Sequence, residues 1–332
     1  MRAPAFWWRP PGLLSALLAP FGAIYGAAAA ARMRGRGRKA PVPVICVGDP
    51  TVGGAGKTPA AIAISKLLVA AGARPAFLTR GYGGRERGPL LVDAAAHRAD
   101  DVGDEALLLA RAAPTIVAAD RVAGAEFAAR VRPTVLLLDD NFQNPALAKD
   151  FSLLVIDGES GVGNGRVFPA GPLRAPLAAQ LARAQALVCN GKGAAGETMA
   201  ARAGAGGLPV FAAKVVPDPG AAQTLAGKRV LAFAGIGRPE KFFRTLAEIG
   251  AGVVERRAFP DHHPYSAREA AELLAAAKAQ DLRLVTTEKD QARIAGAPEL
   301  ASLHAASAVL PIALEFADTP ALMRRLAAVA GC

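Results

Sequence analysis

The chain has 332 residues, which is enough for about two domains of ordinary size. Its 52% of hydrophobic and 20% of charged residues exclude a disordered chain. The net charge is +11, but residues 1–39 hold seven of the excess charges, so the other 293 residues carry only +4. We therefore expect no nucleic-acid partner. Three cysteines without a CxxC pair favour a reducing compartment and exclude a cysteine zinc site.

Residues 10–31 form a run of 22 residues without a charge, between Trp7–Trp8 and the basic run 32–39. Helical spacing places bulky side chains on one face of this segment and small ones on the other. The bulky face holds Leu13, Leu14, Leu17, Leu18, Phe21, Ile24 and Tyr25, and the small face holds Ser15, Ala16, Ala19, Gly22, Ala23 and Gly26. The pattern predicts an interfacial membrane helix, with tryptophans at headgroup level and arginines near an anionic membrane surface.

Two alternatives stay open for this segment: a helix that spans the membrane, and a buried core helix followed by a solvated basic loop. A cleaved signal peptide is disfavoured, because the glycine-rich segment TVGGAGKT that follows has the pattern of a nucleotide-phosphate loop, and nucleotides of this kind are cytoplasmic.

Short apolar runs then alternate with helix-like segments such as 59–71 and 104–112. The runs lie at 42–48, 75–81, 114–120, 134–140, 152–158 and 186–191. Because these runs are apolar on both faces, they predict buried parallel strands of a doubly wound α/β domain. A polar residue or glycine ends each run, so we expect a polar carboxyl edge of the sheet, where ligands bind in such folds.

A Gly/Ala-rich stretch at 191–207 precedes a second α/β pattern with runs at 229–237, 252–259 and 282–290. We therefore expect three parts: an N-terminal helix with its basic flank (1–39), a core domain (40–208) and a smaller C-terminal α/β domain (209–332). The segments 209–217 and 309–316 are expected to pair as a two-stranded linker, and 318–330 to form a last helix.

The sequence TVGGAGKT follows the first predicted strand and precedes a helix, as in a phosphate-binding P-loop. The loop consists of Thr51, Val52, Gly53, Gly54, Ala55, Gly56, Lys57 and Thr58. Lys57 can reach the β- and γ-phosphates, while Thr58 with Asp139 or Asp140 can hold Mg²⁺. Thr51 replaces the usual first glycine. A guanine-type NKxD motif is absent, which favours ATP; the alternative is a structural glycine turn.

These and further motifs resemble the tetraacyldisaccharide 4′-kinases. The matching stretches are 51–59, 78–84, 102–110, 117–121, 137–144, 156–174, 233–243, 259–265 and 286–290. The resemblance implies a P-loop NTPase fold with a doubly wound, mostly parallel sheet, a smaller α/β domain and a membrane-associated helix. Two departures occur, since Asn141 and Asn144 stand where the family has Gly and His.

The resemblance implies an ATP- and Mg²⁺-dependent kinase of lipopolysaccharide biosynthesis. Its substrate would be the 4′-hydroxyl of the acylated glucosamine disaccharide 1-phosphate precursor of lipid A. The protein would be peripheral or monotopic at the cytoplasmic face of the bacterial inner membrane, and no obligate protein partner is inferred.

The resemblance also implies roles for individual residues. Asp104 would be the base, His262 its partner and Lys57 a catalytic cation, with His263 as a rival for the histidine role. For Asp104 the alternative is a helix N-cap. Apart from these roles, candidate substrate-side residues are Arg80, Arg121, Gln143, Asn164 and Arg174. The arginines among them could clamp the substrate's 1-phosphate or the ATP phosphates, and structural pairing with nearby acids is the alternative.

Two other functions compete with the kinase. One is a membrane-peripheral P-loop ATPase that drives a partner protein. The other is a nucleotide-regulated membrane adaptor without chemistry, which the many carboxylates at the strand ends disfavour.

Overall fold

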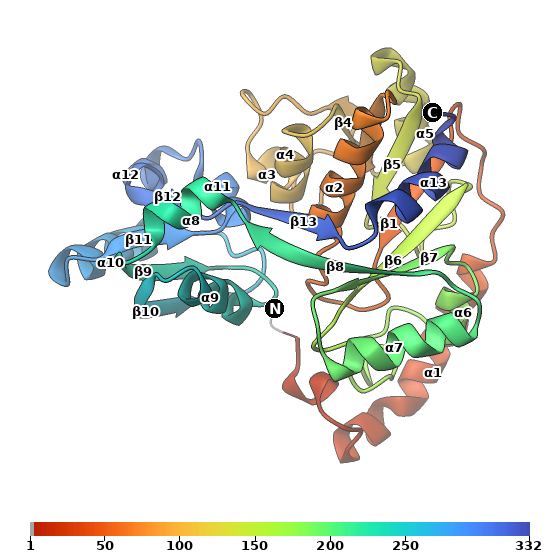
Figure 1. Cartoon of the computed structure of the whole chain (residues 1–332), viewed down its shortest axis with the longest axis horizontal. Helices are drawn as coiled ribbons and strands as arrows, with labels where there is room; N and C mark the ends of the chain where they lie inside the picture. Colours follow the sequence, from red (N-terminus) through yellow and green to blue (C-terminus); the bar gives the residue numbers. More distant parts are fainter. Residues whose placement is uncertain (1–2) are drawn as a thin grey trace.

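The structure, a computed structural model, describes residues 3–332 and contains two sheets. The larger sheet has nine strands in the order β13-β8-β7-β6-β1-β5-β2-β4-β3, and the smaller has four in the order β10-β9-β11-β12. We refer to residues 218–311, which build the four-stranded sheet, as the small unit, and to the rest as the large unit. The two units lie side by side in Figure 1, with β8 and β13 running between them.

The large sheet is parallel except at β3 and β13. Its strands are β1 (Val44–Gly48), β2 (Pro75–Thr79), β3 (Leu90–Leu91), β4 (Thr115–Val117), β5 (Val135–Asp139), β6 (Phe151–Asp157), β7 (Ala186–Asn190), β8 (Val210–Pro217) and β13 (Ile312–Phe316). Every residue of β1, β2, β5 and β6 is buried. The expected doubly wound, mostly parallel sheet is confirmed.

The helices of the large unit cover both faces of this sheet. They are η1 (Ala5–Trp8), α1 (Leu13–Met33), α2 (Lys57–Ala70), α3 (Ala99–Val102), α4 (Asp104–Ala110), α5 (Arg121–Phe127), η2 (Ala128–Val131), α6 (Leu177–Leu181), α7 (Ala194–Ala205) and α13 (Thr319–Ala330). Ile45 and Val47 of β1 pack with α2 and α13, while Val44 and Cys46 face the opposite core. This alternation follows from the two-residue period of a strand.

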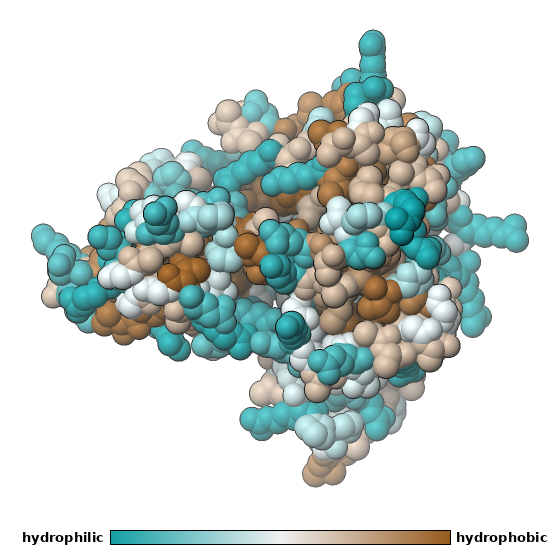
Figure 2. Space-filling view, in the orientation of Figure 1, coloured by the Kyte–Doolittle hydropathy of each residue, from teal (hydrophilic) through white to brown (hydrophobic). Residues whose placement is uncertain are grey.

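The small unit places its parallel sheet between two helical layers. It contains β9 (Arg229–Ala234), β10 (Gly252–Ala258), β11 (Arg283–Thr286), β12 (Ser307–Val309), α8 (Pro219–Leu225), α9 (Pro239–Glu248), α10 (Ala267–Ala279), α11 (Glu288–Ile294), η3 (Pro298–Leu300) and α12 (Ala301–Ala306). Phe243 of α9 lies in one core and Leu273 of α10 in the other. In the view of Figure 2 the surface of this unit is mostly hydrophilic.

The strand expected at 282–290 is shorter in the structure. It ends at Thr286, because Thr287 accepts a hydrogen bond from Asp290 N–H and caps α11.

The expected pairing of the two linker segments is present. Segments 210–217 and 312–316 pair antiparallel, with Leu314 opposite Val215, and β8 also pairs with β7. Since α13 packs against α2, the last helix joins the core of the large unit. The domain boundary at 208/209 stays a proposal.

The small face of α1 packs on the protein at its buried residues Ser15, Gly22 and Gly26, whereas Ala16 and Ala23, expected on the same face, are exposed. Ser15 Oγ donates to Ala170 O at 3.1 Å, and a Cβ added to Gly22 would lie 2.8 Å from Val167 O. The bulky face is exposed, from 45% at Tyr25 to 80% at Leu13, except at the half-buried Leu18. Among the described residues α1 is long and apolar enough to cross a membrane, with 17% of its most apolar window buried. This low burial contradicts the core-helix alternative.

The expectation that both tryptophans lie at headgroup level is wrong for Trp7. Trp7 is only 5% exposed, and its Nε1–H donates to Pro169 O at 3.0 Å. Trp8 packs under the Arg238 guanidinium, 4.7 Å from the ring centre. The indole N–H of Trp7 and the ring face of Trp8 find partners inside the protein, so neither depends on lipid.

Candidate active site

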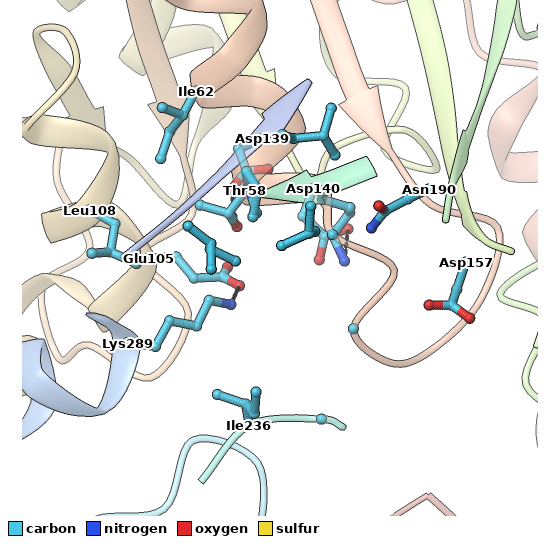
Figure 3. Close-up of a pocket in the computed structure, with 18 of the residues that line it drawn as sticks. Thr58, Ile62, Glu105, Leu108, Asp139, Asp140, Asp157, Asn190, Ile236 and Lys289 are labelled. Carbon is cyan, nitrogen blue, oxygen red and sulfur yellow. Dashed lines mark hydrogen bonds and ion pairs between the residues drawn. The ribbon is translucent and has the colours of Figure 1, made fainter. Parts of the chain in front are cut away.

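A cavity of about 1510 Å³ lies between the carboxyl edge of the large sheet and the small unit. In Figure 3, Thr58, Asp139 and Asp140 lie close together on one wall, and Ile236 of the small unit lies opposite. The P-loop, the ends of β5, β6 and β7, and the loops after β9 and β10 all contribute side chains to its lining. The cavity therefore has the position expected for a ligand site at a strand edge.

The P-loop joins β1 to α2 at this wall. Gly56 has φ +91°, and a Cβ on it would lie 2.5 Å from Asn190 Nδ2, so only glycine fits. Thr51 is buried and forms a bridge with Leu173, while Val52 N–H donates to Pro172 O at 2.8 Å. The backbone of Thr51 is therefore held by the segment around Leu173, and the loop accommodates a threonine at the position of the usual first glycine. The free N–H groups at the start of α2 can bind phosphate.

Lys57 belongs to a compact network of two cations and two carboxylates. Its Nζ lies 2.7 Å from Asp49 Oδ2 and 3.8 Å from Asp140 Oδ1. Arg174 lies 3.1 Å from Asp49 and 3.2 Å from Asp140. Burial acts to lower the pKa of Lys57, but Asp49 and Asp140 outweigh it and raise that pKa, so the lysine stays charged.

Thr58 and the carboxylates after β5 form a second group of oxygen atoms. Thr58 Oγ1 lies 3.3 Å from Asp139 Oδ2, and Oδ1 of both Asp139 and Asp140 is buried without a hydrogen-bond partner. Burial, helped by the Glu105 charge, raises the pKa of Asp139 to about 8. Carboxylate oxygens without a hydrogen-bond partner, in a cluster where the pKa of one carboxyl is raised, suit a divalent cation such as Mg²⁺.

No group of three or more His, Cys, Asp or Glu side chains in residues 3–332 is arranged to hold a metal ion. Mg²⁺ at this position would therefore need further oxygen ligands from phosphate or water, as this ion commonly does.

Asp104 and His262 meet across the two units. Asp104 is the first residue of α4 and is 3% exposed, and its Oδ1 accepts the Glu105 N–H at 2.8 Å. His262, from the loop after β10, places Nδ1 3.1 Å from both carboxylate oxygens. Gly103 occupies the N-cap position, so the N-cap alternative for Asp104 is wrong.

The pKa shifts of this pair have opposing causes. Burial alone would raise the pKa of Asp104, but the hydrogen bond from His262 and the charges of Lys289 and Arg293 hold it below its usual range. Burial would lower the pKa of His262, but the hydrogen bond and charge of Asp104 raise it. The carboxylate is therefore anionic at neutral pH.

His263, the rival for the histidine role, faces another partner. Its Nε2 lies 2.9 Å from Glu269 Oε1, and its ring stacks on Phe259. His262 has φ +54°, and this left-handed backbone turns the two adjacent rings in different directions.

Four of the five expected substrate-side residues line the cavity: Arg80, Arg121, Gln143 and Arg174. Arg121 is buried and donates to Ala118 O and Ala119 O at 2.8 and 3.0 Å. Gln143 donates to Asp49 O at 2.8 Å. Arg121, Gln143 and Arg174 thus keep a structural partner while they face the cavity.

Asn164 differs from the other expected substrate-side residues. Its Nδ2 donates to Ala170 O at 2.9 Å and lies 3.4 Å from Ser15 Oγ. The structure therefore places it in the packing of α1 and not among the residues that line the cavity.

Asn141 and Asn144, the two departures from the family motif, differ in burial. Asn141 is 2% exposed, and neither of its side-chain polar atoms has a partner. Asn144 Oδ1 accepts the Ala146 N–H at 2.9 Å and stabilises the turn.

Several charged residues of the site were not expected from the sequence. Lys289 pairs with Glu105 at 2.6 Å, and Arg238 and Lys241 both pair with Asp157 across the units. These three cations lie in stretches that match the family motifs, 233–243 and 286–290. Nothing in the local sequence shows which acid each cation contacts.

A glycine loop between a buried parallel strand and a helix, with carboxylates ending the neighbouring strand, defines a P-loop nucleotide-binding enzyme. A comparison with family models narrows this class. The model of the family described as tetraacyldisaccharide-1-P 4′-kinase matches residues 14–330. The chain belongs to this family, so the resemblance and the assignment as a kinase are confirmed.

Individual relatives agree. The chain is 55% identical to a tetraacyldisaccharide 4′-kinase of Methylobacterium nodulans (strain LMG 21967 / CNCM I-2342 / ORS 2060), covering 99% of this chain and 96% of the relative. It is 56% identical to one from Xanthobacter autotrophicus (strain ATCC BAA-1158 / Py2), covering 96% and 94%. It is also similar to the crystal structure of "apo" form LpxK from Aquifex aeolicus in complex with ATP, with TM-score 0.72, 26% identity and coverage of 96% and 99%.

Proposed function

We propose that this protein transfers the γ-phosphoryl group of ATP to the 4′-hydroxyl of a tetraacyl glucosamine disaccharide 1-phosphate, a step of lipid A formation. The observation that carries the proposal is the Asp104–His262 pair. A buried carboxylate held by a histidine from the other unit stands beside the cavity that contains the P-loop. The names of the relatives supply the substrate class.

The chemistry assigned to these residues is a displacement at phosphorus. The oxygen of the sugar hydroxyl forms a bond to the γ-phosphorus, the bond from this phosphorus to the bridging oxygen breaks, and ADP leaves. The hydroxyl proton passes to the Asp104 carboxylate, which His262 orients. Lys57 and the N–H groups of the P-loop stabilise the charge that develops on the phosphate oxygens.

We assign Thr58, Asp139 and Asp140 to a Mg²⁺ ion that accompanies the nucleotide. When bound, this ion neutralises phosphate charge. The residues themselves would hold it through the Thr58 hydroxyl and two buried carboxylate oxygens that accept no hydrogen bond from the protein.

We place the protein at the cytoplasmic face of the bacterial inner membrane, bound through α1 as a peripheral or monotopic protein. The exposed face of α1 supports this placement, since Leu13, Leu17, Phe21 and Ile24 are each more than 60% exposed. Arg32 lies in the last turn of α1, and Arg34, Arg36 and Arg38 follow the helix. These arginines would face anionic headgroups. An acceptor with acyl chains could then reach the cavity from the bilayer.

The proposal is tested by incubating the full chain with γ-labelled ATP, Mg²⁺ and the tetraacyl disaccharide 1-phosphate in detergent micelles. We expect label at the 4′ position, and a loss of about 10²- to 10⁴-fold in the Asp104→Asn variant, which keeps the size of the side chain. ATP hydrolysis that proceeds equally without the lipid, with no labelled lipid, would instead favour the partner-driving ATPase.

A further inference from the structure

Arg293 of α11 touches the carboxylate assigned as the base. Its Nε lies 3.2 Å from Asp104 Oδ2, and the side chain is only 8% exposed. Oδ1 of Asp104 accepts the Glu105 N–H at 2.8 Å, and His262 Nδ1 lies 3.1 Å from both oxygens. The carboxylate is therefore held by three groups, of which two come from the small unit.

Arg293 is itself fixed from behind. Its second terminal nitrogen lies 2.8 Å from Asp290 Oδ1. Asp290 is fully buried and also accepts hydrogen bonds from Gly235 N–H at 2.8 Å and Tyr265 O–H at 2.6 Å. The guanidinium thus joins the core of the small unit to Asp104, and its planar fork allows little movement.

The neighbouring cation on α11 has a different partner. Lys289, one turn earlier, pairs with Glu105 at 2.6 Å. The residues of the described chain that line the cavity include Glu105, His262 and Lys289, but neither Asp104 nor Arg293. Asp104 contacts both Glu105 and His262 and so lies next to the lining, whereas Arg293 touches Asp104 from the far side and acts through it.

We propose that Arg293 is a positioning residue for the phosphoryl transfer: it holds the Asp104 carboxylate anionic and oriented toward the acceptor hydroxyl. The proposal rests on the function proposed above. A guanidinium suits this task, because it presents a fixed planar fork of N–H donors to a carboxylate, whereas the charge of His262 titrates.

The charged and titratable groups around Asp104 fix the direction of the pH effect. They are His262 and Asp261 from the loop after β10, Lys289, Asp290 and Arg293 from α11, and Glu105 from α4. Arg293 lowers the pKa of Asp104, so its removal raises that pKa. Because the base must be ionised, the acid limb of the pH–rate profile then moves to higher pH.

The experiment measures single-turnover transfer to the acylated disaccharide after brief pH jumps to values between about pH 3 and about pH 9, because the pKa of Asp104 lies below its usual range. The proteins compared are the wild type, Arg293→Met, Arg293→Gln and Arg293→Lys. We expect both neutral variants to lose about 10- to 100-fold in rate, and their acid limb to move up by about 1 pH unit. Arg293→Lys should return the limb to the wild-type position, while KM for ATP stays unchanged in all variants.

Arg268→Met is the matched control, because Arg268 lies on α10 of the same unit and pairs at the surface with Glu272. Its rate and profile should equal those of the wild type. If the wild-type protein formed no labelled lipid, the proposed function itself would be refuted. With an active wild type, the proposal for Arg293 is overturned if a folded neutral variant keeps the wild-type profile, or if both neutral variants unfold while Arg293→Lys shows a shifted limb.

Discussion

At the scale of single residues, the site contains more charge than the P-loop pattern requires. Lys57 is bound to Asp49, and Arg174 bridges Asp49 and Asp140, so each cation has a protein partner when the chain is alone. A triphosphate brings several negative charges that can replace these carboxylates as partners of Lys57. The network therefore holds the lysine at the phosphate position before nucleotide binds.

Lys57→Met tests this role. The substitution keeps the length and the apolar stem of the side chain but removes the charge, so we expect the transfer rate at saturating ATP to fall by about 10²- to 10³-fold. The rate is measured as ADP release that depends on the acylated acceptor. Lys278→Met, at an exposed position of α10, is the control. A rate within twofold of the wild type would remove Lys57 from the catalytic group.

At the scale of elements, the two faces of α1 differ, since one packs on the protein and the other is exposed. The helix continues through Pro20, and its small residues allow the backbone to approach the segment 167–176. The bulky residues are left outside. An interfacial helix attached to a globular protein needs this division, because small residues bring the helix close to the protein and bulky ones enter the lipid.

Gly22→Leu should separate α1 from the large unit. A Cβ at this position already lies 2.8 Å from a backbone oxygen, so the leucine must displace the helix, at a cost of about 1–3 kcal/mol. We expect a lower Tm and faster protease cleavage in 3–33. Ala23→Leu, one residue later on the exposed side, is the control and should leave both unchanged. Equal cleavage of the two variants would contradict the packing described here.

At the scale of the whole molecule, the two units meet at the reaction site. Asp104 belongs to the large unit, whereas His262 and Arg293 belong to the small unit. Arg238 and Lys241 of α9 pair with Asp157 at the end of β6. The units are joined covalently through β8 and β13, and they also meet through these ion pairs and through apolar packing of Ala292 of α11 against α3 and α4.

Membrane binding is predicted to depend on the exposed face of α1. The triple variant Leu17→Ser, Phe21→Ser and Ile24→Ser leaves the packed face intact, so we expect normal ATP binding but loss of flotation with vesicles that contain anionic lipid. Val69→Ser with Val254→Ser, both exposed elsewhere, is the control.

Salt then distinguishes the two modes of membrane binding. Raising salt from 0.1 M to 1 M shortens the Debye length from about 10 Å to about 3 Å. A protein bound through an interfacial helix should therefore dissociate in part from the vesicles at high salt, whereas a protein held by a spanning helix should stay bound. Flotation of the triple variant equal to that of the wild type would contradict both modes.

The amino-acid sequence by itself determined the features that depend on neighbours along the chain. The P-loop is a local turn whose glycines and Lys57 are adjacent in sequence, and strands buried on both faces show their apolar runs directly. The two faces of α1 follow from its helical period. These patterns, with the family motifs, were sufficient for the fold class and for Asp104, Asp139 and Asp140 as candidates.

Only the tertiary structure decided which distant groups meet. His262 and His263 are adjacent in the sequence, where only the family motif favours His262, and the left-handed backbone at His262 separates their partners. The contact of Arg293 with Asp104 exists because α11 packs on α4 across the two units. Trp7 is buried for the same kind of reason, since a loop far along the chain accepts its N–H. Hydrogen bonds and ion pairs depend on distance in space, which the order of residues does not contain.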